Sequence, residues 1–294
     1  MAELIRLNEK TYYLNARTRI GFVRLANNGV CVIDSGIDEA AGLEILSVVK
    51  ENGWTLETLV NTHGHADHVG GNRVLQEETG CRILARGIDA DMARDTLINP
   101  SLLYGGHPGK DLNGRFFYAA PSAVKDLNLS PELLPEGLKM LPLSGHAADM
   151  IGLLCEDGTA FIGDALCGER ALSKNPFPFV YDPDAALRSL DFLLTVEAKI
   201  FVSSHLDPTS DIRPLVKLNR EAIVNAKERI LDALKTPLCF DALLKNLLDG
   251  ADMTLDFSQY ALVGSTVRSY LTSLREEGLI RPLFEDNILL WEKE

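Results

Sequence analysis

The segment THGHADH at residues 62–68 constrains this chain more than any other feature, because it holds three of the chain's six histidines. It follows a short apolar run, so it stands where a buried strand is expected to end. In an extended segment, residues two apart point the same way, and His63 and His65 can therefore face one metal ion together. As the chain turns into the next helix, Asp67 and His68 can point at a second ion nearby. The segment predicts a metal site at the end of a strand.

Imidazole nitrogens and carboxylate oxygens are ligands that suit zinc, iron or manganese. The five cysteines are scattered, odd in number and without CxxC spacing, which argues against a closed structural zinc site and against a disulfide framework. An open catalytic site is therefore expected, with two divalent metal ions: zinc in first place, iron or manganese as alternatives. The competing interpretation is a chance group of histidines in a surface loop.

Apolar strands and helical patterns alternate along the first two-thirds of the chain, which is typical of layers of sheet and helix. Helices are expected over residues 39–51, 69–78 and 185–194. Strands are expected within residues 11–34 and over residues 58–63, 81–85, 138–143, 151–155, 159–165 and 199–205. Residues 87–142 are rich in Gly, Pro and Asn and are too long for a plain connection, so we expect a lid or pocket wall there.

The pattern changes from Ile212 onwards, where one apolar stripe marks a long helix that Pro237 ends. Three shorter helices are expected over residues 240–250, 258–264 and 265–278, followed by a terminal hairpin whose turn contains residues 285–287. Helices followed by a β-wing suggest a winged helix. We therefore expect a catalytic domain over residues 1–210, a long connecting helix over 211–235 and a winged-helix-like domain over 236–294.

The formal net charge of −13 argues against nucleic acid as a partner, since such a field repels phosphate backbones. The C-terminal segment from residue 236 carries five basic against ten acidic residues, and so offers no basic surface for RNA. No run of eighteen apolar residues is present, and Glu3 interrupts what would be the apolar part of a signal peptide. We expect a soluble, cytoplasmic protein with no membrane association, which could pair as a homodimer through its C-terminal module.

The THGHADH segment resembles the HxHxDH signature of the metallo-β-lactamase superfamily, and the resemblance covers roughly residues 11 to 210. It implies an α+β fold of four αββα layers, a sandwich of two sheets flanked by helices. It also implies further ligands at later strand ends, where His146, Asp164 and His205 stand. Asp34 matches an early strand-end aspartate of the family that supports the site without ligating. The implied ligand set is His63, His65 and His146 for one metal ion, Asp67, His68 and His205 for the other, and Asp164 bridging both.

All seven ligands are present together in glyoxalase II-like thioesterases, so a small-molecule thioester or related carboxylic ester is the leading substrate class. Two metal ions that share a water lower its pKa, which makes a bridging hydroxide the expected nucleophile. Asp67 is expected to act in catalysis by accepting the proton of that hydroxide and passing it to the leaving group. His107 lies outside every ligand position and is kept as a substrate contact.

Other members of the superfamily provide alternatives. Secreted β-lactamases of this fold commonly have a cysteine where Asp164 stands, and flavodiiron proteins have a glutamate where His65 stands, so both residues argue against these two functions. Quorum-quenching lactonases carry a tyrosine where this chain has Cys167, which weakens a lactonase function. The overall layout resembles the lactamase-β-like protein 2 group, whose single-stranded RNA endonucleases supply the second hypothesis. Two further hypotheses remain. One is a persulfide dioxygenase with a single iron, and the other is a non-enzymatic winged-helix interaction protein with a vestigial hydrolase domain.

Overall fold

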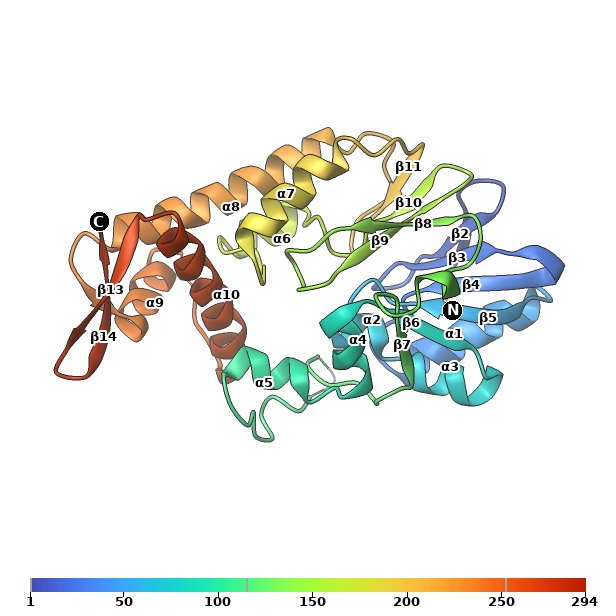
Figure 1. Cartoon of the computed structure of the whole chain (residues 1–294), viewed down its shortest axis with the longest axis horizontal. Coiled ribbons are helices and arrows are strands. Elements are labelled where there is room, and N and C mark those ends of the chain that lie inside the picture. Colours follow the sequence, from blue (N-terminus) through green and yellow to red (C-terminus); the bar gives the residue numbers. More distant parts are fainter. Residues whose placement is uncertain (1, 115, 252) are drawn as a thin grey trace.

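The computed structural model describes residues 2–114, 116–251 and 253–294, and its two sheets face each other with helices on their outer sides (Figure 1). The first sheet has the order β1-β2-β3-β4-β5-β6-β7 and the second the order β11-β10-β9-β8. The strands of the first sheet are β1 (Leu4–Arg6), β2 (Thr11–Leu14), β3 (Ile20–Arg24), β4 (Gly29–Ile33), β5 (Thr55–Val60), β6 (Arg82–Ala85) and β7 (Val124–Asp126). The strands of the second are β8 (Leu138–Pro142), β9 (Ile151–Cys155), β10 (Thr159–Phe161) and β11 (Ile200–Val202).

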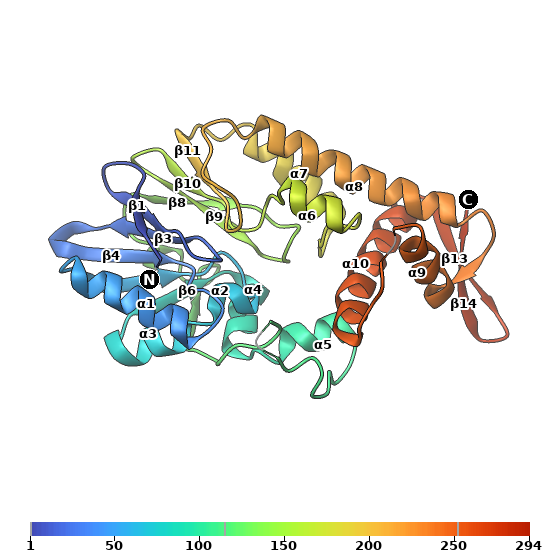
Figure 2. The same ribbon diagram turned by 180° about the vertical axis from the view of Figure 1, so that it is seen from behind.

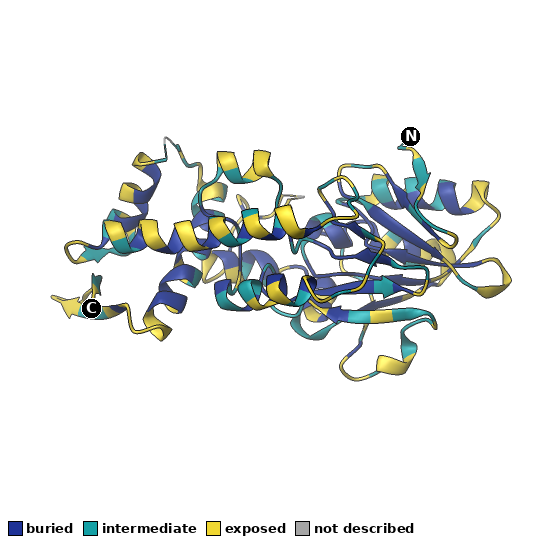
Figure 3. Ribbon diagram, turned by 90° about the horizontal axis from the view of Figure 1, so that it is seen from above, coloured by how far each residue is buried: buried dark blue, intermediate teal, exposed yellow. Residues whose placement is uncertain are grey.

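The helices cover the outer faces of the two sheets. Those beside the first sheet are α1 (Glu39–Glu51), α2 (Ala66–Val69), α3 (Asn72–Thr79) and α4 (Gly87–Arg94), whereas α5 (Ile98–Tyr104) extends from α4 towards the C-terminal segment. Those beside the second are α6 (Glu169–Lys174), α7 (Pro183–Leu193) and the long α8 (Arg213–Ala233). Figure 3 shows α8 with one side exposed along its length, as expected for a helix with a single apolar stripe. The four αββα layers predicted from the sequence are confirmed.

The alternation of side chains along β4 explains how its sheet is covered. A helix covers one face of the sheet, and the second sheet covers the other face. All five residues of β4 are buried. Val30 and Val32 pack in the cluster that contains Ile45 of α1, whereas Cys31 and Ile33 pack between the sheets in the cluster that contains Leu153 of β9. Successive side chains of a strand point to opposite faces, so an uninterrupted apolar strand needs cover on both sides.

The helix expected over residues 69–78 is divided in the structure into α2 and α3. The break falls at Gly70 and Gly71, where the chain passes close to the segment after β4. A Cβ on Gly70 would lie 2.1 Å from the carbonyl carbon of Ile37, and the N–H of Gly70 donates to the carbonyl of Gly36. This tertiary contact therefore determines where α2 ends. The helical periodicity of the sequence gives no information about it.

The C-terminal segment contains α9 (Phe240–Asp249), α10 (Phe257–Glu276) and a three-stranded sheet of β12 (Leu238–Cys239), β14 (Ile288–Lys293) and β13 (Ile280–Glu285). The terminal hairpin is present as expected. The two helices predicted over 258–264 and 265–278 are wrong, because α10 runs unbroken through Gly264. Asp256 and Gln259 form a capping box at its start, and its buried face continues through Val263, Val267 and Tyr270. Burial of that face outweighs the cost of about 1 kcal/mol for a glycine inside a helix.

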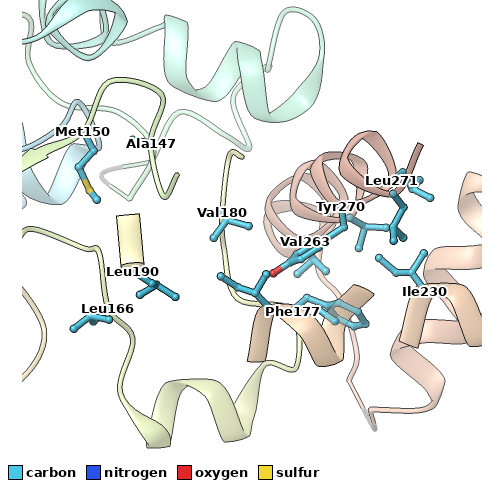
Figure 4. Close-up of a cluster of buried hydrophobic side chains, with 14 of the residues drawn as sticks. Ala147, Met150, Leu166, Phe177, Val180, Leu190, Ile230, Val263, Tyr270 and Leu271 are labelled. Atoms are coloured by element: carbon cyan, nitrogen blue, oxygen red, sulfur yellow. The ribbon is translucent and has the colours of Figure 1, made fainter. Parts of the chain in front are cut away.

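The C-terminal segment shares one hydrophobic cluster with the second sheet and α7, and Figure 4 shows part of it. The cluster runs from Met150 and Leu190 through Phe177 to Val263 and Tyr270. Tyr270 is fully buried, and its hydroxyl donates to the carbonyl of Pro178 at 3.4 Å. Because the core is continuous, the packing fixes how α10 sits relative to the sandwich. The domain boundaries at 210 and 235, and the winged-helix identity of the last segment, stay predictions.

An ion-pair network around the buried Lys227 also joins α8 to the C-terminal segment. Lys227, 8% exposed, donates to Asp184 Oδ1 and to Glu277 Oε1, each at 2.7 Å, and Ser273 donates to Asp184 Oδ2 at 2.8 Å. Burial alone would raise the pKa of Asp184, but the hydrogen bonds from Lys227 and Ser273 outweigh it and lower that pKa. Three helices, α7, α8 and α10, are therefore held together through one ammonium group.

None of the helices in the described ranges is both long enough and apolar enough to cross a membrane.

Replacing Lys227 by Met is expected to lower the free energy of unfolding by about 1–3 kcal/mol, because Asp184 and Glu277 lose their shared cation while still half-buried. The share of the loss that comes from Asp184 should shrink as the pH falls through the lowered pKa of that carboxyl, because a lowered pKa contributes stability only above it. Urea denaturation at pH 7 and pH 3 measures both effects. Lys217→Met is the control, because its pair with Glu221 spans 3.8 Å on the surface and should contribute less than about 0.5 kcal/mol. Equal losses in the two variants would contradict the role of the network.

Candidate metal centre

All seven residues of the expected ligand set lie where a strand ends, on the same side of the sandwich. The THGHADH segment follows β5, His146 follows β8, Asp164 follows β10 and His205 follows β11. Backbone hydrogen bonds connect these loops: Ile151 N–H donates to the carbonyl of Thr62 at 2.9 Å, and Ser204 N–H donates to that of Gly163 at 3.0 Å. The two sheets therefore bring together side chains that are up to 142 positions apart in the sequence.

The seven side chains form three overlapping groups whose ligand atoms lie within 4.8 Å of one another. The groups are His63, His65 and His146; Asp67, His68 and His205; and His63, His68 and Asp164. Within the first group, His65 Nδ1 and His146 Nε2 are 3.1 Å apart. The third group contains members of both, so the two three-residue groups are adjacent.

Asp164 lies between the two groups. Its Oδ1 is 3.5 Å from His68 Nε2, and its Oδ2 is 3.6 Å from His146 Nε2 and 3.3 Å from His205 Nε2. The carboxylate of Asp67 is on the side of His205, with Oδ2 3.4 Å from His205 Nε2. One carboxylate thus reaches both groups, and the other reaches only the second.

Three polar atoms of this cluster are buried and have no hydrogen-bond partner within the described ranges: His63 Nε2, His68 Nε2 and Asp164 Oδ1. A buried polar atom without a partner is costly, and such atoms are rare in folded proteins. All three belong to one group of candidate ligands, and two imidazole nitrogens with a carboxylate oxygen suit a divalent cation. The residues present therefore fit a metal site.

Asp34 orients the THGHADH segment from the end of β4. Its carboxylate accepts the N–H of Thr62 at 2.7 Å, the hydroxyl of Thr62 at 2.8 Å and Nδ1–H of His68 at 2.8 Å. The bond to Nδ1 orients the ring so that Nε2 is directed at Asp164, and in a neutral His68 it would leave Nε2 as the nitrogen available to a metal ion. Asp34 itself has a positive φ of 62°, a conformation that Asp tolerates better than most residues.

The electrostatics of the cluster separate its histidines into two kinds. Burial, aided by neighbouring histidines, lowers the pKa of His65 to about 3 and that of His63 well below its ordinary value. Burial would also lower the pKa of His68, but the carboxylates of Asp34, Asp164 and Asp67 raise it well above the ordinary value. The pKa of His205 rises to about 10, since hydrogen bonds to Asp164 and Asp67 outweigh burial. The two histidines that face the carboxylates, His68 and His205, thus have raised pKa values, whereas His63 and His65 have lowered ones.

Sequence reasoning missed Asp89, which connects the two loops that carry the first group. It is fully buried on α4, and its carboxylate accepts the N–H of Gly64 at 2.8 Å and that of Asp149 at 2.7 Å. Burial raises its pKa to about 6 despite these two hydrogen bonds. Nothing in the sequence separates Asp89 from the other acidic residues, since its partners are backbone groups of distant loops.

A pocket of about 380 Å³ opens beside the cluster and is bounded by His65, by α5 and by α10. Residues of α4 and α5 form one wall, so part of the 87–142 segment does line a pocket, although it is helical there. His107, expected as a substrate contact, is exposed and is not among the lining residues, so that assignment stays a prediction without structural support. Cys167 lines a separate cavity of about 20 Å³ behind His146 and Asp164.

A larger cavity of about 630 Å³ lies elsewhere on the sandwich, lined by residues such as Lys10, Arg24 and Glu136. It contains none of the seven cluster residues. The volume of a cavity therefore does not identify the candidate metal centre in this protein. The chemistry of the residues around it does identify it.

Comparison with known proteins gives the same fold over the whole chain. A family model for the metallo-beta-lactamase superfamily matches residues 17–205. A metallo-beta-lactamase family protein of Thermus thermophilus aligns with a TM-score of 0.67 at 19% identity, over 100% of this chain and 98% of that one. A beta-lactamase domain protein of Burkholderia ambifaria aligns with a TM-score of 0.72 at 16% identity, over 99% and 94%. At such identities, these structures show the shared fold, which includes the C-terminal segment.

Curated relatives match over shorter segments. The chain is 30% identical over 174 residues to a hydroxyacylglutathione hydrolase of Methylococcus capsulatus, which covers 57% of this chain and 55% of that protein. It is 37% identical over 71 residues to a hydroxyacylglutathione hydrolase of Rhodospirillum rubrum, which covers 24% and 27%. The matched segments thus span between about a quarter and just over half of these relatives.

Replacing Asp34 by Asn is expected to weaken metal binding about 10–100-fold, because the amide cannot accept all three hydrogen bonds and no longer orients the ring of His68. Competition titration with a chromophoric chelator and Zn²⁺ measures the affinity. Asp126→Asn is the matched control, since Asp126 accepts the N–H groups of Gly87 and Asn128 and has no contact with the cluster. An affinity for Asp34→Asn within twofold of the control would contradict the orienting role.

Proposed function

Because this chain belongs to the metallo-beta-lactamase superfamily, we propose that it is a dinuclear metal-dependent hydrolase that cleaves a thioester or a related carboxylic ester. One observation carries the proposal: three buried ligand atoms, on His63, His68 and Asp164, have no partner and lie in the middle of a seven-residue cluster of imidazoles and carboxylates. The substrate class is supported by the curated relatives, which are named hydroxyacylglutathione hydrolases.

In this proposal His63, His65 and His146 would hold one divalent metal ion, and Asp67, His68 and His205 the other. Asp164 would contribute to both, in keeping with its position between the two groups. Zinc is the first choice for such a set of imidazole and carboxylate ligands, with iron or manganese as alternatives. When bound, the ions supply Lewis acidity, which makes water nucleophilic near neutral pH and polarises a substrate carbonyl.

Asp67 has the position and charge for moving a proton. Burial alone would raise its pKa, but the neighbouring His68 and His205 outweigh it and bring the pKa to about 2. Asp67 is therefore ionised at neutral pH, which is the charge state that both a metal ligand and a proton acceptor need. Its side chain is 23% exposed, whereas that of Asp164 is 12% exposed, so Asp67 is the more accessible of the two carboxylates. We assign Asp67 the transfer of a proton from the attacking water to the leaving group.

Phe179 orients the first histidine group from the pocket side. Its carbonyl faces His146 Nδ1 at 3.3 Å, and its ring packs edge-on against His65 and His146 with centroids 5.6 and 5.3 Å away. The hydrogen bond at Nδ1 leaves Nε2 of His146 directed at the cluster. The ring excludes water from one side of the histidines, which strengthens electrostatic interactions with a bound carbonyl.

The decisive experiment is a hydrolysis panel on metal-loaded protein with thioesters, carboxylic esters, lactones, phosphodiesters and short single-stranded RNA. We expect turnover of thioesters or esters, and a loss of at least about 100-fold in kcat/KM for Asp164→Ala, because a group reaching both metal sites is removed. Asp191→Ala, which removes a surface partner of Arg220, is the control that should keep full activity. Cleavage of RNA or phosphodiesters alone would replace this proposal with the nuclease hypothesis.

Replacing Asp67 by Asn is expected to lower kcat about 100-fold or more, since general acid–base groups contribute roughly 10²–10⁴-fold. Metal content by elemental analysis must accompany the kinetics, because Asp67 is also a proposed ligand. A variant that retains both metal equivalents and full turnover would refute the proton-transfer role while leaving the hydrolase proposal intact. A variant that loses one equivalent of metal would identify Asp67 as a ligand. In that case the loss of kcat would be attributed to the missing metal ion.

A further inference from the structure

The pocket beside the metal centre has two chemically different ends. At one end is His65, a member of the metal cluster, and at the other is one face of α10, which contributes Ser265, Arg268 and Ser269. These three positions are spaced by three and four residues, so they share a face of the helix. The volume of about 380 Å³ falls in the range of small-molecule sites. A ligand that fills the pocket would therefore touch both the metal centre and the C-terminal segment.

The wall between the two ends is apolar and aromatic. Leu103 and Phe179 line it, and Leu102, Tyr104 and Tyr181 line its mouth with exposures of 47%, 43% and 51%. Large apolar side chains so exposed around one cavity mark a binding surface. The helix α5, which carries Leu102 and Tyr104, contacts α10, and the two lie side by side in both Figure 1 and Figure 2. The wall is thus part of the packed structure and does not depend on a mobile segment.

Arg268 is the one lysine or arginine among the described residues that line this pocket, and no Asp or Glu lines it. Its guanidinium group stacks on the ring of Phe240, 3.9 Å from the centroid, which holds the group in place. It interacts with the hydroxyl of Tyr260, which itself donates to Asp241 at 2.8 Å. Within the described ranges, no carboxylate oxygen lies within 4.0 Å of Arg268, so its charge has no ion-pair partner.

That lack of a partner contrasts with other surface arginines of this acidic chain. Arg73 pairs with Glu77 at 2.9 Å, and Arg213 pairs with Asp211 at 2.7 Å. Although the chain has a net charge of −13, no carboxylate is among the described residues that line this pocket, and the carboxylate of Asp241 is separated from Arg268 by the hydroxyl of Tyr260. The charge of Arg268 attracts an anion, and a guanidinium group can bind a carboxylate or phosphate with two hydrogen bonds.

We propose that this pocket selects thioester or ester substrates that carry an anionic group, a carboxylate or a phosphate, and that Arg268 binds that group. The scissile carbonyl lies at the His65 end, and an apolar or aromatic segment lies against the wall between. Arg268 is a specificity-determining residue that does not touch the reacting atoms. This inference rests on the proposed hydrolase function and adds the class of substrate to it.

The test compares three thioesters of matched length, which end in a carboxylate, a phosphate or a neutral amide. With metal-loaded wild-type protein we expect higher kcat/KM for one or both anionic substrates. Arg268→Gln should raise KM for the preferred anion about 10–100-fold with kcat changed less than about twofold, and should leave the neutral substrate unaffected. Arg268→Lys should restore only part of the affinity, because it keeps the charge without the planar fork. The two anionic arms show whether the anion is a carboxylate or a phosphate.

The matched control is Arg275→Gln, on the same helix but outside the pocket, which should behave as wild type. Thermal unfolding of each variant checks that the loss of stacking on Phe240 has not unfolded α10. Calorimetry with non-hydrolysable thioethers that end in a carboxylate, a phosphate or a neutral amide measures binding without turnover. Equal binding of anionic and neutral thioethers, or equal effects of Arg268→Gln on both, would overturn the inference. If no thioester is cleaved but Arg268 still governs binding of the anionic thioether, the proposed reaction fails and the anion site stands.

Discussion

The candidate metal centre depends on one buried carboxylate, that of Asp34, which ties the end of β4 to the segment that follows β5. It accepts two hydrogen bonds from Thr62 and one from His68, so three donors in a continuous turn are fixed by a single side chain. The turn is thereby held in the shape that directs His63 Nε2 and His68 Nε2 into the same space. Were Asp34 unable to accept these bonds, the imidazoles would be free to rotate, and the site would lose its preorganisation.

A second buried carboxylate, that of Asp89, plays the same part between the loops that follow β5 and β8. By accepting the N–H groups of Gly64 and Asp149, it holds the loop of His65 against that of His146. Both carboxylates act on backbone or ring N–H groups that would otherwise be buried without partners. The two carboxylates therefore connect the chain after β4, β5 and β8, where four of the candidate ligands and His146 lie.

The C-terminal segment completes the pocket without contributing to the metal cluster. Its helix α10 packs into the same hydrophobic cluster as α7 and the second sheet. Lys227 of α8 connects α7 with the end of α10, because it donates to Asp184 and to Glu277. As a result, the face of α10 that carries Arg268 has a fixed place opposite His65. The residues of α10 that line the pocket and the residues of the metal cluster therefore lie on different elements of the fold.

The sequence by itself determined the alternation of strands and helices and the spacing of the candidate ligands in the THGHADH segment, because both are local patterns. The spacing of His63, His65, Asp67 and His68 at a strand end, with strand and helix periods around it, is legible without tertiary contacts. Three features depend on contacts between distant residues, and only the tertiary structure decided them. They are the hydrogen bonds of Asp89, the end of α2 at Gly70 and the unbroken helix through Gly264. At Gly264, buried packing outweighs the low helix propensity of glycine. The pocket belongs to the same class, since its two ends, His65 and Arg268, are 203 positions apart and meet only because a continuous core fixes them.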